Sequence, residues 1–126
     1  MDLLLSSSLH NPIEYPKHSG SLVVYLTKDI FLRYISLNVC DIQRELDMEW
    51  VESLKSKAQA MFDTHGYYDF GMFHVGHLEG TLYILDGQHR YMVLRGLEDV
   101  HIDVQVKLYD FKDHNEMNQR FQMING

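Results

Sequence analysis

Hydrophobic and polar positions divide the first third of the chain into an irregular lead-in, a strand and a short helix. Residues 21–27 (SLVVYLT) are rich in β-branched and aromatic side chains and predict a first strand. Residues 28–35 predict a short helix with apolar side chains near one face. Residues 1–20 hold both prolines and a serine run, so we expect them to form an irregular N-terminal arm.

The middle of the chain carries the clearest helical signal, followed by a hairpin. A helix is predicted to begin after Asp47, a good N-cap residue, and to stop at Gly66. Residues 70–75 and 81–85 predict two strands, joined by a connection over 76–80 that has glycine at each end. The second strand is continuously apolar, which indicates burial on both faces.

The last third alternates helix, strand and helix. After a turn at Asp86 and Gly87 the pattern predicts a helix over about residues 88–97. Residues 101–109 alternate strictly between apolar and polar, which is typical of a half-buried strand. A final helix is predicted from about Asp113, with Met117 and Phe121 at helical spacing. This order predicts one small α+β domain over residues 21–126, with a mixed sheet packed by helices.

Composition and charge narrow the function. The 126 residues suit one domain, and 45% apolar with 23% charged residues is an ordinary globular balance. A net charge of −7 with scattered cations disfavours general electrostatic binding of nucleic acid, although a local pocket can still hold a phosphate. The single cysteine, Cys40, leaves no disulfide within the chain. We therefore expect an intracellular protein, cytoplasmic or nuclear, with no signal peptide and no membrane partner.

The loop Asp86–Arg90 is the candidate site, because it follows a buried strand and opens a helix. The free N–H groups of a first helical turn, with the helix dipole behind them, favour an anion. Gly87 would let a ligand approach the backbone, Arg90 would grip phosphate, and Gln88 and His89 would add donors. Asp86 would orient Arg90 or a ligand-bound metal. In the structural alternative, Asp86 caps the helix, Gly87 makes the turn, and Arg90 pairs with a surface acid.

The stretch YILDGQHRY at residues 83–91, followed by LRGL at 94–97, resembles the DGQHR group of the ParB/sulfiredoxin superfamily. In that superfamily a G-x-x-R loop at a helix start binds nucleotide phosphates. Gln43 and Arg44 resemble an early segment that folds over the same pocket, and FQMIN at 121–125 is similar to the group's F-x-x-I-N run. The chain stops right after this motif, so we expect it to be a fragment of a longer protein.

The resemblance implies a ParB/sulfiredoxin-like fold that binds ATP or CTP with Mg²⁺, acts as a slow NTPase and regulates a DNA-related process. DNA, or a DNA-associated protein, would be reached through a partner or a region not in this chain. Gln88 occupies the position of the sulfiredoxin cysteine, so sulfiredoxin chemistry is not expected. The implied catalytic residues are Asp86 and His89, and the implied nucleotide-binding residues are Gln43, Arg44, Gly87, Gln88, His89 and Arg90.

Two other functions stay open at this point. One is a non-catalytic interaction domain that keeps the fold. The other is a metal-dependent nuclease that uses Asp86 with Glu79 or Asp103. A metal cluster of His74, His77, Asp86 and His89 is disfavoured, because strand residues three apart point to opposite faces. We assign no metal site.

Two single residues also have two interpretations each. Trp50 is expected in the core, with base stacking as the alternative. Arg44 lies over the pocket or makes a surface ion pair with Glu45 or Asp47.

Overall fold

The computed structural model describes residues 20–35, 37 and 46–125. Nearly all of the predicted arm, together with Gln43, Arg44 and Glu45, therefore lies outside the described residues. The predicted α+β class is confirmed. In chain order the elements are β1 (Ser21–Thr27), α2 (Lys28–Tyr34), α3 (Met48–His65), β2 (Met72–Leu78), β3 (Thr81–Asp86), α4 (Gln88–Gly96), β4 (Asp103–Asp110) and α5 (His114–Asn125).

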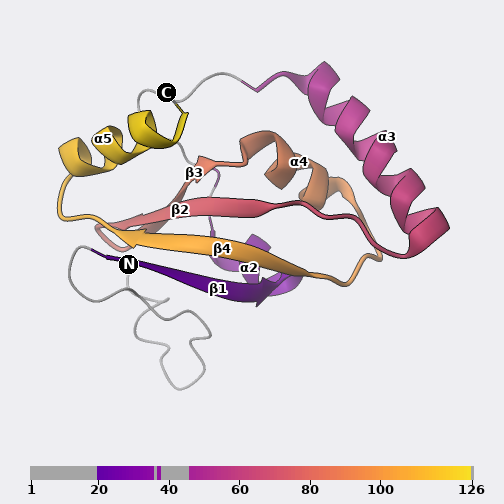
Figure 1. Cartoon of the computed structure of the whole chain (residues 1–126), viewed down its shortest axis with the longest axis horizontal. Coiled ribbons are helices and arrows are strands. Elements are labelled where there is room, and N and C mark those ends of the chain that lie inside the picture. The colour runs from indigo at the N-terminus through magenta and orange to yellow at the C-terminus, as the bar shows by residue number, and fades with distance from the viewer. Residues whose placement is uncertain (1–19, 36, 38–45, 126) are drawn as a thin grey trace.

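The strands form one mixed sheet in the order β1-β4-β2-β3. β4 runs antiparallel to β1 and parallel to β2, and β2 pairs antiparallel with β3. Figure 1 shows the strands side by side, with α3 and α5 at opposite ends of the sheet. The expected mixed sheet packed with helices is therefore present.

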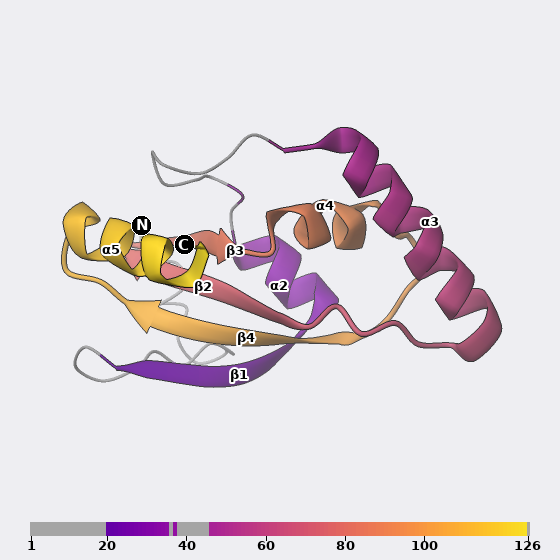
Figure 2. The ribbon, with the colours of Figure 1, turned by 45° about the horizontal axis from the view of Figure 1, so that its top comes forward.

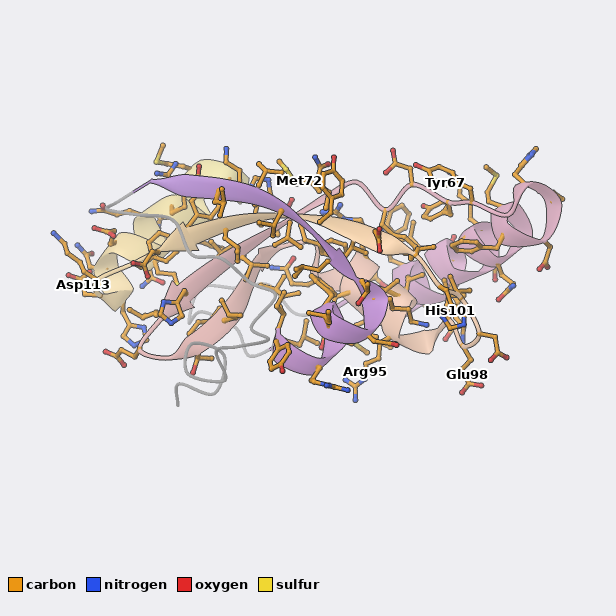
Figure 3. All side chains as sticks on the ribbon, turned by 90° about the horizontal axis from the view of Figure 1, so that it is seen from below. Tyr67, Met72, Arg95, Glu98, His101 and Asp113 are labelled. Carbon is orange, nitrogen blue, oxygen red and sulfur yellow. The ribbon has the colours of Figure 1, made fainter. Side chains whose placement is uncertain are left out.

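Apolar side chains cover both faces of this sheet. A larger cluster, which includes Phe31, Phe73 and Tyr91, packs α2, α3 and α4 against one face. A smaller cluster, with Phe111 and Met117 at its centre, packs α5 against the other. In Figure 3, Met72 and Tyr67 lie toward one face of the sheet, and Arg95 lies beside α2 toward the opposite face.

The predicted five-residue hairpin connection is wrong. β2 continues to Leu78, and only Glu79 and Gly80 form the turn, with φ of 52° and 80°. Both residues take positive φ, as a two-residue hairpin turn with the twist of its strands requires. Gly76 lies inside β2, where an added Cβ would come within 2.4 Å of the Phe111 ring. This glycine therefore allows close approach of an aromatic ring and makes no turn.

The long helix α3 begins and ends where its caps predict. The Asp47 side chain accepts a hydrogen bond from the Trp50 N–H at 3.1 Å, and Gly66 takes the left-handed conformation at φ 69°. The expectation that Trp50 belongs to the core is wrong, because its side chain is 52% exposed. The buried face of α3 holds Val51 and Ala58 instead. Trp50 occupies the first turn on the exposed side, which keeps base stacking as a hypothesis.

Candidate functional site

The start of α4 is an uncapped helix N-terminus. Asp86 ends β3, and Gly87 takes the N-cap position at φ 106° without any side-chain capping bond. The alternative in which Asp86 caps the helix is therefore wrong. Because no side chain caps this first turn, its N–H groups keep the positive end of the helix dipole open to an anion.

Gly87 is required by the packing around it. An added Cβ would lie 2.6 Å from the Phe73 ring and 2.9 Å from Nη2 of Arg90. Its φ also lies in the region that L-residues rarely adopt. Side chains of this chain therefore already occupy the space beside Gly87, and the close approach of a ligand to its backbone stays a prediction.

Arg90 of α4 contacts the start of β2 and the end of β3. Nη1 donates to the carbonyl oxygens of Phe70 at 2.5 Å and Met72 at 3.2 Å. Nη2 pairs with the Asp86 carboxylate at 3.4 Å, and the guanidinium carbon lies 4.9 Å from the centre of the Phe73 ring. Asp86 thus contacts Arg90 as its predicted orienting role requires. A phosphate bound beside Arg90 would reach only the guanidinium N–H groups that these contacts do not use.

His89 joins the beginnings of two helices. Its Nε2 accepts a hydrogen bond from the backbone N–H of Asp47, the N-cap of α3, at 2.9 Å. That bond requires an unprotonated Nε2, so the ring carries its hydrogen on Nδ1. Figure 2 shows that α3 and α4 pack together and begin near one another. The side chain of Gln88 turns back instead and donates to the Leu85 carbonyl at 3.2 Å.

A second set of polar residues, which the sequence pattern did not predict as a site, lies on the α5 face of the sheet. His74 of β2 is paired with Asp86 of β3, and its Nδ1 lies 2.9 Å from the Tyr109 hydroxyl. Lys107 and Arg120 flank the same tyrosine ring. The alternation of apolar and polar residues in β4 indicated that Lys107 and Tyr109 share one face of the sheet. This pattern could not reveal which residues of β2 and α5 lie beside them.

The candidate metal ligands do not gather at one point. Among the described residues, no three His, Cys, Asp or Glu side chains come together in a group that could hold a metal ion. His74 contacts Tyr109, and His77 contacts Asp110, each at 2.9 Å. Tyr109 and Asp110 are consecutive residues of β4, so their side chains point to opposite faces of the sheet. Glu79 lies in the turn before β3 and Asp86 ends this six-residue strand, which is about 20 Å long. They therefore cannot share an ion in this arrangement.

The pKa of His74 is lowered, first because burial penalises the charged imidazolium. Asp86 opposes this effect, while Lys107 and Arg90 add to it. The unfolded chain therefore binds a proton at His74 more readily than the folded chain. Unfolding free energy consequently rises with pH through this group and falls as the pH drops below about 6.5.

We predict that His74→Gln flattens this part of the stability profile. Urea unfolding of the wild type at about pH 7.5 and about pH 5.5 should show a loss at the lower pH, part of which His74→Gln removes. His114→Gln, which changes an exposed histidine, serves as the matched control and should keep the wild-type loss. An equal loss in wild type and His74→Gln would contradict the prediction.

No family model, curated protein or solved structure matches this chain. Among the described helices, none is both long enough and apolar enough to cross a membrane.

Proposed function

We propose that this chain binds a nucleotide, ATP or CTP, with its phosphates at the start of α4. One observation carries the proposal: the uncapped N-terminus of α4 lies against the start of α3, and the His89–Asp47 hydrogen bond joins the two at 2.9 Å. The backbone N–H groups and the dipole of α4 then favour negative charge at this place, whereas the Asp47 carboxylate already caps the start of α3.

An exposed aromatic side chain near this point supports a nucleotide over a simple anion. Trp50 lies in the first turn of α3, and its backbone N–H donates to the Asp47 side chain. The backbone N–H of the same Asp47 donates to His89. A large apolar ring left 52% exposed offers a stacking surface for a base. The carboxylates of Asp47 and Asp86 would repel phosphate, and a Mg²⁺ ion bound with the nucleotide would offset this charge.

In the proposed activity, bound nucleotide is hydrolysed slowly and its state regulates a DNA-related process. Asp86 pairs with the Arg90 guanidinium, and His89 would offer the N–H of its other ring nitrogen to the phosphates. Gln43 and Arg44 would close over the ligand. DNA, or a DNA-associated protein, would be reached through another chain or region, because a net charge of −7 disfavours general electrostatic binding of nucleic acid.

The direct test is a titration with ATP, CTP, GTP and their diphosphates, with and without Mg²⁺. Trp50 is the only tryptophan, so its fluorescence reports on stacking at the proposed site. Ligand at about 100 times its dissociation constant should add about 2.7 kcal/mol to the unfolding free energy. Release of inorganic phosphate measures hydrolysis. If no nucleotide changes either fluorescence or stability, the proposal fails.

We predict that His89→Glu weakens nucleotide binding at least tenfold, which corresponds to about 1.4 kcal/mol. A carboxylate in this first turn repels phosphate while it interacts favourably with the helix dipole. The folded state should therefore persist, as circular dichroism can verify. His114→Glu makes the same charge change in the first turn of α5 and should bind nucleotide like the wild type. Equal affinities in His89→Glu and wild type would place the phosphates elsewhere.

The second candidate, a non-catalytic interaction domain, is supported by the contacts of Arg90. Two backbone carbonyls and one carboxylate of the same chain already occupy its guanidinium. The edge strand β1 also leaves Val23 45% and Tyr25 69% exposed, as a protein-binding edge would. This candidate would be favoured if the wild type bound no nucleotide and the Arg90→Ala variant still bound a partner protein.

A further inference from the structure

Within the described part of the chain, the strand β1 uses only one side of its backbone for pairing. The sheet order β1-β4-β2-β3 puts β1 at one edge, as Figure 1 shows. The Lys28 N–H donates to the Ile102 carbonyl at 2.9 Å, which continues the register of β1 with β4. Bonding residues alternate along an antiparallel pair, so the even-numbered residues of β1 bond to β4. The other residues therefore turn their N–H and C=O groups to the outer edge, as Ser21, Val23 and Tyr25 do.

β1 has none of the features that usually keep an exposed edge from pairing. Natural edge strands are blunted by charged residues, proline or a β-bulge. Residues 21–27 (SLVVYLT) include neither a charged residue nor a proline, and all seven pair with β4 without a register shift. The side chains of Val23 and Tyr25 are 45% and 69% exposed and share one face of the sheet. A partner strand would therefore meet both backbone groups and apolar side chains along this edge.

The order of side chains in β1 fits a second copy of β1. When two copies run antiparallel and centred on Val24, Val23 of each copy lies opposite Tyr25 of the other. Pairs of an aromatic and a β-branched side chain stabilise neighbouring strands. The same register puts the outward backbone groups of these two residues opposite each other, so that they can bond. The remaining residues pair like with like: Leu22 with Leu26, Val24 with itself, and Ser21 with Thr27.

Charge also favours this edge as the contact between two copies. The chain carries a net charge of −7, so two copies repel each other when their acidic surfaces approach. β1 itself is uncharged. The β4 residues beside it carry one charge of each sign, because Lys107 pairs with Val23 and Asp103 pairs with Thr27. Two copies can therefore meet along β1 without bringing a net negative surface together.

We propose that this chain forms a two-fold symmetric dimer in which the β1 strands of two copies pair antiparallel, centred on Val24. The two sheets become one continuous sheet, and the exposed side chains of Val23 and Tyr25 cover one another. A two-fold interface of this kind is closed, so assembly stops at two copies. The proposed nucleotide site lies after β3, the strand at the opposite edge of the sheet. The dimer therefore does not depend on nucleotide binding.

The first test is sedimentation of the full chain at increasing concentration, combined with amide hydrogen exchange. A dimer should form at or below about 1 mM, a concentration at which even weak association is populated. The backbone N–H groups of Val23 and Tyr25 should exchange more slowly as the dimer forms. A chain that stays monomeric up to this concentration would overturn the proposal. Protection of these two groups that does not depend on concentration would also overturn it, because the edge would then be covered within one chain.

Substitutions on the exposed side of β1 test the register. Val23→Lys and Tyr25→Glu should each weaken the dimer at least tenfold, because each puts a charge against an apolar side chain of the other copy. The double variant Val23→Lys/Tyr25→Glu should recover part of the affinity, since the introduced lysine and glutamate of the two copies then lie opposite each other. Met123→Lys and Tyr67→Glu make the same changes at exposed positions outside β1 and should associate like the wild type.

Circular dichroism should show that these surface variants stay folded. A dimer as stable in both single variants as in the wild type would place the interface elsewhere and overturn the proposal. A double variant no tighter than the single variants would overturn the register centred on Val24. His89→Glu should dimerise like the wild type, so a failure of the nucleotide site can be told apart from a failure of the dimer.

Discussion

Replacing Gly87 by alanine is expected to lower the free energy of unfolding by about 2–5 kcal/mol. The left-handed conformation costs an alanine about 1–2 kcal/mol. The new methyl group would also press on the Phe73 ring at 2.6 Å, and overpacking of this kind costs about 1–3 kcal/mol. Urea unfolding monitored by circular dichroism measures the change.

Gly66→Ala is the matched control for this strain. Gly66 has φ 69°, and an added Cβ there would meet nothing within 4 Å. Its replacement should therefore cost only the backbone strain, about 1–2 kcal/mol. If Gly87→Ala were no less stable than Gly66→Ala, the side chains of Phe73 and Arg90 would move aside without lowering the free energy of unfolding. The close approach would then not explain why glycine stands at the start of α4.

Arg90→Ala is expected to cost about 2–4 kcal/mol of stability, whether or not Arg90 also binds phosphate. The substitution leaves the carbonyl oxygens of Phe70 and Met72 without their donor and removes the partner of Asp86. Hydrogen bonds to charged groups contribute about 1.5–3 kcal/mol. The Arg90 side chain is 26% exposed, so water compensates for part of the loss. Urea unfolding without ligand isolates this structural term.

Arg95→Ala on the same helix is the control. Arg95 is exposed, and surface substitutions of this kind usually change stability by no more than about 0.5 kcal/mol. A change of the same small size in Arg90→Ala would show that the contacts around Arg90 contribute little. A large cost would mean that lost nucleotide binding in Arg90→Ala cannot be separated from lost structure. For this reason His89→Glu is the sharper test of the phosphate site.

Local features of the sequence determined where most elements lie. Asp47 and Gly66 set the two ends of α3, because capping depends on bonds within one helical turn. The alternation over residues 101–109 predicted β4 to within two residues at each end, since its period is a property of the strand itself. The passage from a strand to a helix was likewise placed correctly, since Asp86 ends β3, Gly87 makes the turn and α4 begins at Gln88.

Only the tertiary structure decided which of these segments meet. Gly76 was predicted as a turn residue, because the ring that requires a glycine there belongs to Phe111, which is distant in the sequence. Trp50 looked like a core residue because its size and type say nothing about which side of α3 packs inward. His74, Tyr109 and Arg120 come from β2, β4 and α5, and parallel pairing of β2 with β4 brings the first two together. Such pairings depend on the packing of whole elements, which no local pattern encodes.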